Sequence, residues 1–104
     1  MNNVIILEEA AEDIERARDF YDAQQRGIGA YFVESITGDL ARLRELSGIH
    51  AQHFGFHRML GSRFRIGIYY RERGRDTLVA AVLDLRRDPS WIRRQLYRRR
   101  TPKE

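Results

Sequence analysis

Apolar residues in the first half of the chain recur at the spacing of amphipathic helices. Residues 3–7 (NVIIL) form a short apolar run, so we expect a first strand within residues 1–7. Two apolar stripes with spacings of three and four follow, separated by the helix breaker RGIG. The stripes are Ala10, Ile14, Ala17 and Tyr21, then Phe32, Ile36, Leu40, Leu43 and Leu46. Residues 8–47 are therefore predicted to form an αα-hairpin.

The second half of the chain changes to the alternating period of β-strands. Two stretches within residues 53–71 alternate apolar and polar positions, and residues 77–85 are apolar on both faces, as in a strand inside a sheet. We expect a three-stranded antiparallel part over residues 53–85 and a short C-terminal helix over residues 90–100. The order β-α-α-β-β-β-α predicts one α+β domain over residues 1–104. Its small, mostly antiparallel four-stranded sheet would carry the αα-hairpin on one face.

The link between the first two strands of the antiparallel part decides which arginines face each other. If residues 61–62 (Gly-Ser) form a two-residue hairpin turn, Leu60 pairs with Arg63 and Arg58 lies opposite Arg65. Like charges directly opposite each other destabilise a sheet, so such a pair indicates a site that holds an anion. A three-residue loop would instead separate these arginines and leave them solvated on an open face.

Charge is divided unevenly between the two halves of the chain. Residues 1–52 carry ten acidic residues and five arginines, a net charge of −5, whereas residues 53–104 carry five acidic and fourteen basic residues, a net charge of +9. All but one of the 19 basic residues are arginines, which bind phosphate and carboxylate groups through paired hydrogen bonds. A GC-rich genome would also favour arginine over lysine, although it would not segregate the charges. The second half therefore predicts a basic surface for a polyanion or an acidic protein.

The composition excludes several classes of site. The chain has no cysteine, no apolar run near the roughly 20 residues of a membrane span, and no visible signal peptide. His53 and His57 would lie about 13 Å apart on one strand, too far to share a metal ion. We therefore expect a cytoplasmic protein with no metal, no cofactor and no membrane partner.

The segment VLDLRRDPSW, residues 82–91, places a buried strand directly before charged residues and the only tryptophan. Arg86 and Arg87 should emerge at the carboxyl edge of the sheet. The Asp-Pro pair that follows suits the start of a helix. Trp91 then either anchors the last helix to the core or remains available to stack on a partner.

The last helix is expected to be strongly basic. Arg93, Arg94, Arg98 and Arg100 would spread around most of its circumference. We consider Arg94 and Tyr97 as candidates for contact with nucleic acid or with an acidic partner segment. The alternative is a solvated terminal helix.

Three segments of the sequence resemble one family of small proteins. DIERARDFYDAQQRGIGAYF, RFRIGIYYRE and VLDLRRDPSW are similar to the RelE/ParE superfamily of toxins from bacterial type II toxin–antitoxin modules, most of all its ParE-like or plasmid stabilisation branch. The resemblance covers about residues 3–95. It implies a toxin held in a hetero-oligomer by a cognate antitoxin, whose acidic or amphipathic C-terminal segment wraps it. ParE-like members inhibit DNA gyrase, whereas RelE-like members cleave mRNA on the ribosome.

The residues that RelE-like nucleases use are only partly present. Arg65 matches an arginine of their third strand, and Arg86 and Arg87 match a basic pair after the last strand. The tyrosine expected next is absent from DPSWIRR, and Tyr97 comes later.

Two further positions depart from the nuclease pattern. The lysines of the second strand are missing, unless Arg58 or His57 replaces them. Asp84 stands where members often carry a histidine, and it could pair with Arg86 or Arg65 and so neutralise the site.

The chemistry follows from these matches. RNA cleavage needs a base, an acid and stabilisation of charge, and arginine serves only the last role well. Under the nuclease reading Arg58, Arg65 and Arg87 would clamp a phosphate. His57 has the most suitable pKa for acid–base work, but it faces away from Arg58 on a strand.

We therefore expect a ParE-like toxin that inhibits DNA gyrase. The alternatives are a ribosome-dependent mRNA endoribonuclease and a non-catalytic nucleic-acid-binding or interaction domain. The expected binding residues are Arg58, Arg63, Arg65, Arg86, Arg87, Trp91, Arg94 and Tyr97.

Overall fold

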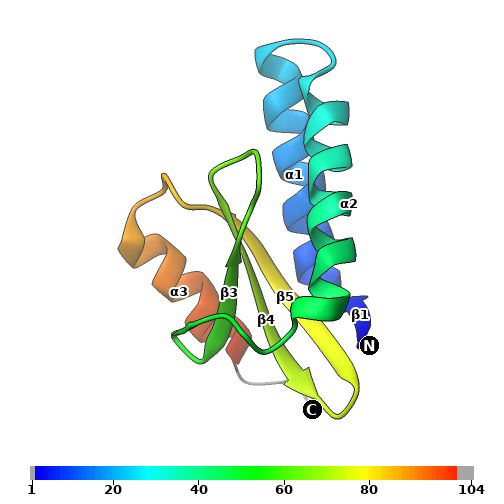
Figure 1. Cartoon of the computed structure of the whole chain (residues 1–104). Helices are drawn as coiled ribbons and strands as arrows, with labels where there is room; N and C mark the ends of the chain where they lie inside the picture. The colour runs from blue at the N-terminus through cyan, green and yellow to red at the C-terminus, as the bar shows by residue number, and fades with distance from the viewer. Residues whose placement is uncertain (1, 101–104) are drawn as a thin grey trace.

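A β-sheet lies between two helical layers in the computed structural model, which describes residues 2–100 (Figure 1). Met1 and residues 101–104 of the expected domain lie outside the described part. The elements, in chain order, are β1 (Asn3–Ile6), α1 (Glu8–Gln24), α2 (Ile28–Leu46), β2 (Gln52–His53), β3 (Phe56–Leu60), β4 (Ile66–Arg73), β5 (Asp76–Asp84) and α3 (Pro89–Arg100). The α+β class, the helical hairpin and the C-terminal helix are confirmed.

The sheet has five strands in the order β1-β5-β4-β3-β2. β1 runs parallel to β5, and the other neighbours are antiparallel. The prediction of four strands missed β2, because an alternating pattern cannot show in two residues. The α1–α2 hairpin covers one face of the sheet and α3 covers the other (Figure 1). No helix within residues 2–100 is long and apolar enough to cross a membrane.

Each face of the sheet has its own apolar core. The predicted stripes of both hairpin helices face the sheet, with Phe32, Ile36 and Leu43 almost fully buried. On the opposite face, Ile92 and Leu96 of α3 pack against the sheet. The helical periodicity therefore identified the packed sides of α1 and α2 correctly.

The register between β3 and β4 differs from both expected hairpins. Arg58 pairs with Tyr69, and the connecting loop comprises residues 61–65. Arg58 therefore does not lie opposite Arg65, and the predicted pair of facing arginines is wrong.

Contacts with the helical hairpin explain this longer loop. Phe64 packs on Tyr21 and Phe32, with ring centroids 4.9 and 5.1 Å away. The buried carboxylate of Asp39 accepts a hydrogen bond from the Ser62 N–H at 3.1 Å. Both contacts draw the loop toward the hairpin, so β4 begins later than the alternating pattern indicates.

A β-bulge interrupts the middle of β5. Tyr69 pairs with Ala81 and Tyr70 pairs with Val79, which leaves Ala80 without a partner in β4. β1 also stops pairing with β5 at Val79. The backbone after this point needs partners from outside the sheet.

A buried ion pair supplies these partners. Arg99 Nη1 donates to the Ala80 carbonyl at 3.1 Å and to Asp13 Oδ2 at 2.6 Å, and the Asp13 carboxylate accepts from the Val82 N–H at 3.0 Å. The Asp13 and Arg99 side chains are only 4% and 7% exposed. Burial alone would lower the pKa of Arg99, but its hydrogen bond to Asp13 raises the pKa above the ordinary value. The pair thus fixes α1 and α3 against the same edge of β5.

Candidate partner-binding groove

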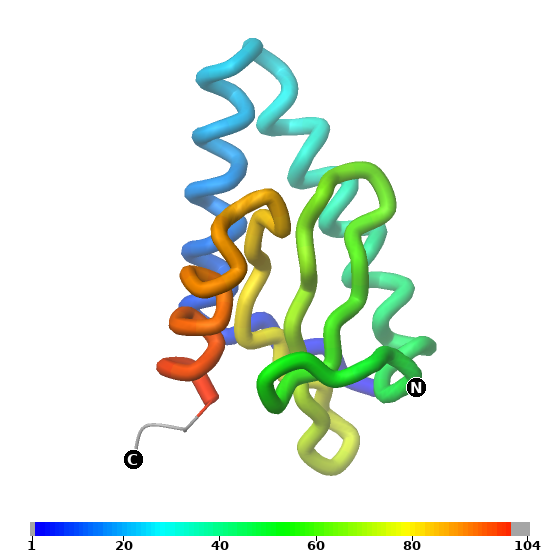
Figure 2. The backbone as a smooth tube through the Cα atoms, turned by 90° about the vertical axis from the view of Figure 1, so that its left-hand side faces the viewer, coloured from blue at the N-terminus to red at the C-terminus, as the bar shows by residue number. Residues whose placement is uncertain are grey.

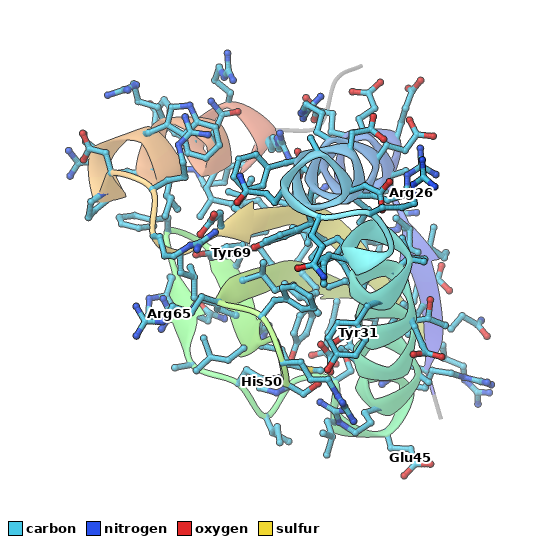
Figure 3. All side chains as sticks on the ribbon, turned by 90° about the horizontal axis from the view of Figure 1, so that it is seen from above. Arg26, Tyr31, Glu45, His50, Arg65 and Tyr69 are labelled. Atoms are coloured by element: carbon cyan, nitrogen blue, oxygen red, sulfur yellow. The ribbon has the colours of Figure 1, made fainter. Side chains whose placement is uncertain are left out.

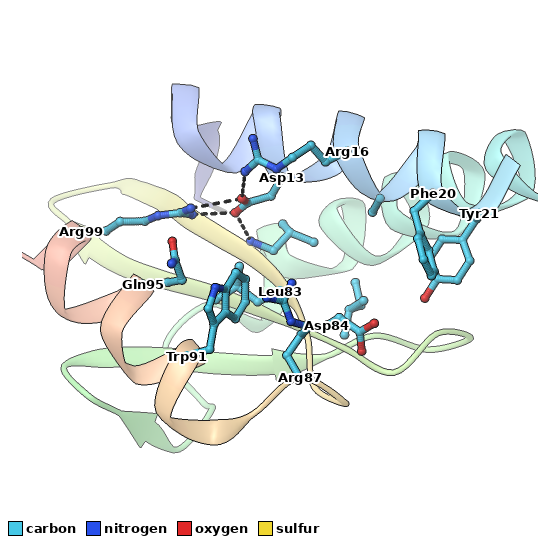
Figure 4. A pocket seen from close by; sticks show the side chains of 13 residues that line it. Asp13, Arg16, Phe20, Tyr21, Leu83, Asp84, Arg87, Trp91, Gln95 and Arg99 are labelled. Atoms are coloured by element: carbon cyan, nitrogen blue, oxygen red, sulfur yellow. Dashed lines mark hydrogen bonds and ion pairs between the residues drawn. The ribbon is translucent and has the colours of Figure 1, made fainter. Parts of the chain in front are cut away.

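A groove of about 290 Å³ opens between α1 and α3, above the free edge of β5 (Figure 4). We call it the α1–α3 groove. Its apolar lining consists of Ala17, Phe20, Tyr21, Ile66, Val82, Leu83 and Trp91. Phe20 is 52% exposed, whereas the apolar stripe of the same helix, Ala10, Ile14, Ala17 and Tyr21, packs against the core. The groove therefore presents apolar surface that the fold itself does not cover.

Charged side chains stand at both ends of the α1–α3 groove. The Asp13–Arg99 pair closes one end, where Arg16 also bonds to Asp13 at 2.8 Å. Asp84 and Arg87 line the other end (Figure 4). An apolar channel between charged ends suits an amphipathic peptide segment.

Arg87 and Trp91 form one unit on the α3 wall of the groove. The Arg87 guanidinium lies 3.7 Å from the centre of the Trp91 ring, which is a close cation–π stack. Trp91 is half-buried and packs against the core between α3 and the sheet, which agrees with the prediction that it anchors the last helix. Arg87 is exposed and has no ion pair with a carboxylate among residues 2–100. Its donor groups can therefore reach a partner that lies in the groove.

Arg86 is engaged inside the protein. It bonds Asp84 through Nε at 3.0 Å and Nη2 at 2.8 Å, and Nη2 also reaches the Tyr21 hydroxyl at 3.2 Å. The hydrogen bond from the Arg86 side chain holds the pKa of Asp84 below its usual value, although partial burial opposes the shift. The expectation that Asp84 could neutralise an arginine is confirmed for Arg86.

The other predicted arginines come from strand β3 and from the loop that follows it. Arg63 donates to the Tyr31 hydroxyl of α2 at 2.9 Å, whereas Arg65 is exposed on another side of the same loop (Figure 3). Arg58 lies opposite Tyr69, on the face of the sheet that α3 covers. Arg63 is thus engaged at α2 and Arg86 at Asp84, so not all of the predicted binding arginines share one patch. A shared site of Arg58, Arg65 and Arg87 stays a prediction.

His57 takes a structural role under the hairpin. Its ring stacks on Tyr70 with centroids 5.1 Å apart, and its Nδ1 bonds the His50 carbonyl at 2.7 Å. It is half-buried, and as the strand neighbour of Arg58 it faces the opposite side of the sheet. The structure therefore does not bring His57 to any of the predicted arginines as an acid–base group.

Sequence reasoning missed several residues that shape the groove, namely Asp13, Phe20, Gln95 and Arg99. A signal existed for Asp13, which falls three residues after Ala10 and so lies on the buried stripe of α1. A carboxylate at such a position needs a buried partner. The partner, Arg99, is 86 residues away, and nothing in the sequence singles it out from its arginine neighbours.

Comparison with known proteins identifies a solved structure with the same fold. No family model matches the chain, and no curated protein matches it. A chain of a solved structure, described as the chromosomal ParDE TA system from P. aeruginosa, matches with a TM-score of 0.70 and 15% sequence identity. The match covers 79% of this chain and 94% of that chain. The fold expected from the RelE/ParE resemblance is therefore confirmed, whereas at this identity the match does not establish an activity.

Proposed function

We propose that the chain is the toxin of a type II toxin–antitoxin module and that a cognate antitoxin neutralises it by occupying the α1–α3 groove. The observation that carries this proposal is the shared fold with a chain of a ParDE system, which spans nearly all of that chain. The motifs that resemble ParE-like toxins support it independently.

The α1–α3 groove fits the chemistry expected of an antitoxin segment. Phe20 and Trp91 offer large apolar surfaces from opposite walls, and such aromatic side chains commonly carry most of the binding free energy of an interface. Arg16, whose side chain is 67% exposed, and Arg87 lie at the two ends, where they can pair with acidic residues. An amphipathic segment with apolar anchors and carboxylates would satisfy both sets of groups.

We infer that the toxin inhibits DNA gyrase by binding rather than cleaving mRNA. Cleavage would require Arg58, Arg65 and Arg87 to surround one phosphate together with an acid–base group. The acid–base candidate His57 faces the side of the sheet opposite Arg58, and its ring is engaged with Tyr70 and with the His50 carbonyl. Inhibition by binding needs no such constellation, so this arrangement favours the gyrase reading over the nuclease reading.

Induced expression in bacteria tests the proposal. We expect growth arrest, relaxed plasmid DNA and intact transcripts. Cuts in mRNA at fixed codon positions that disappear with Arg65→Ala would instead identify the ribosome-dependent nuclease. Unimpaired growth at a verified protein level would identify a non-catalytic nucleic-acid-binding or interaction domain.

A further inference from the structure

We propose that the outer side of α3, together with the β2–β3 turn, binds single-stranded nucleic acid. We call this surface the α3 arginine face. It consists of Phe54, Arg93, Arg94, Tyr97, Arg98 and Arg100. It lies outside the α1–α3 groove, so it is a second binding surface in addition to the proposed antitoxin site.

The packing of α3 separates the two surfaces. Ile92 and Leu96 are buried against the sheet, and Trp91, Gln95 and Arg99 line the α1–α3 groove. The other residues from Arg93 to the end of the helix are all exposed, and they are Arg93, Arg94, Tyr97, Arg98 and Arg100. Burial of one stripe of the helix thus leaves the other side entirely to arginine and tyrosine.

The charge of the α3 arginine face is not compensated within residues 2–100. Arg93, Arg94, Arg98 and Arg100 have no carboxylate within ion-pair distance in this part of the chain. Arg98 bonds only the side-chain oxygen of Gln95, at 2.6 Å. Four guanidiniums without a carboxylate partner in this part of the chain repel one another, and a bound polyanion would relieve this repulsion.

Two aromatic rings accompany the guanidiniums. Tyr97 is 64% exposed, and the Arg100 guanidinium lies 4.8 Å from the centre of its ring. Phe54 is 48% exposed in the two-residue turn between the paired residues His53 and Phe56. The rings are therefore available for stacking rather than buried as core.

Phe54 is an unusual residue for its position. Its φ of +55° lies in the left-handed region, which bulky side chains rarely adopt and where asparagine or glycine is ordinary in such turns. A Cβ atom on the adjacent Gly55 would lie 3.1 Å from Arg100 Cδ, so this turn touches the end of α3. Figure 2 shows the turn beside the last residues of the helix. The turn that carries the exposed Phe54 thus adjoins the end of the α3 arginine face.

This combination selects the class of ligand. Guanidiniums bind backbone phosphates, and exposed rings stack on bases that are not paired. Arg93 and Arg100 are about 10 Å apart along the helix axis, which corresponds to roughly three stacked nucleotides. A duplex would hide its bases from the rings, and an acidic peptide would leave the rings without stacking partners. Single-stranded DNA or RNA uses every group on the face.

The test measures fluorescence anisotropy of labelled 12-nucleotide single strands, one of deoxythymidine and one of uridine, titrated with the purified chain. We expect Tyr97→Ala to weaken binding by about five- to a hundredfold, because one stacked base is lost. Tyr97→Phe should bind like the original chain. The double variant Arg94→Ala/Arg98→Ala should weaken binding and reduce the slope of log affinity against log salt by about 1.4.

A matched control carries the same loss of charge elsewhere. Arg26→Ala/Arg44→Ala removes two exposed arginines that have no ion pair within residues 2–100 and do not belong to the α3 arginine face. We expect this control to keep nearly the full affinity, and thermal unfolding verifies that every variant is folded. Growth plays no part in the test, so its result is independent of the proposed toxin function.

Three results would overturn the proposal. A 12-base-pair duplex that binds as tightly as the single strands, with no effect of Tyr97→Ala, would show non-specific attraction to any polyanion. Tighter binding of a glutamate-rich peptide than of either strand would identify an acidic protein partner. Equal losses in the control and the Arg94/Arg98 variant would show that net charge, and not this surface, determines binding.

Discussion

Replacing Asp13 with asparagine removes one charge from the ion pair that holds α1 and α3 against β5. The Asp13 carboxylate accepts hydrogen bonds from Arg99 at 2.6 and 3.2 Å, from Arg16 at 2.8 Å and from the Val82 N–H at 3.0 Å. The asparagine side-chain oxygen can still accept from Val82. The perturbation therefore acts mainly on the Arg99 guanidinium, which stays buried and loses its buried counter-charge. It keeps only the exposed carboxylate of Glu9, at 3.9 Å.

The expected cost follows from this burial. Removing one partner of a buried ion pair destabilises a protein by about 3–5 kcal/mol. A domain of this size unfolds with a free energy of roughly 5–15 kcal/mol, so the variant should fold but be much less stable. At a denaturant slope near 1.5 kcal/mol per molar urea, the unfolding midpoint should fall by about 2–3 M.

Two companion variants separate the buried pair from its surroundings. Arg16→Ala removes only the exposed partner of the same carboxylate, so we expect a loss of about 0–1 kcal/mol. Asp13→Asn/Arg99→Met removes both charges and should lose about 1–3 kcal/mol less than the sum of the single variants. Urea unfolding followed by circular dichroism measures the original chain, these three variants and the single variant Arg99→Met. If Asp13→Asn costs no more than Arg16→Ala, the buried pair does not hold the helices as we describe.

Three further predictions concern single positions. Gly38→Ala should raise the free energy of unfolding by about 0.5–1 kcal/mol in urea unfolding. Gly38 lies in the middle of α2 on its exposed side, and its new Cβ would meet nothing within 4 Å. A loss of stability would contradict this helix geometry. Gly67→Ala should lower the free energy of unfolding by about 1–3 kcal/mol in the same assay, because the new Cβ would lie 2.9 Å from the Tyr69 ring and 3.1 Å from Leu85. An unchanged free energy would show that the α3 side of the sheet has more space than we describe. The pKa of His50 is lowered, first by burial and then by the charge of His57. The unfolded chain therefore binds the imidazole proton more tightly than the folded chain does. The stability that is present above about pH 6.5 should be lost as the pH falls through the pKa of His50 in the folded chain. The urea midpoints at pH 7.5 and pH 5.5 measure this loss of stability. His50→Gln should reduce the difference between the two midpoints but not remove it, because the pKa of His53 is also lowered by burial. An unchanged difference would exclude His50 as a source of the pH dependence.

Local patterns in the sequence were enough to predict the three helices and the central strand, but not the two-residue strand β2, the start of β4 or the site. The stripes that end in Tyr21 and Leu46 are periodic over many residues, so α1 and α2 could be assigned with their packed sides. The run over residues 77–85 identified a central strand because its apolar residues continue on both faces. These features depend on neighbours in the chain.

The features that the sequence did not reveal depend on contacts between distant segments. The β3–β4 register follows from the packing of Phe64 against the α1–α2 hairpin and from the hydrogen bond between Asp39 and Ser62. A prediction from the turn residues alone includes neither contact. The α1–α3 groove exists because Arg99 of α3 reaches Asp13 of α1 across the bulge in β5. Of the predicted binding residues, only Arg87 and Trp91 line this groove.

Copurification with the neighbouring gene product tests the central claim most directly. The chain is expressed from a bicistronic plasmid together with the reading frame that adjoins its own, which the proposal expects to encode a small acidic antitoxin. Affinity capture measures the amount of partner bound. We predict that the original chain and Ile49→Asp, which alters a 70% exposed residue outside the α1–α3 groove, retain the partner. Phe20→Asp should weaken binding more than thirtyfold, because it places a charge on an apolar anchor of the groove. Failure of the original chain to retain the partner, or equal retention by Phe20→Asp, would contradict the account.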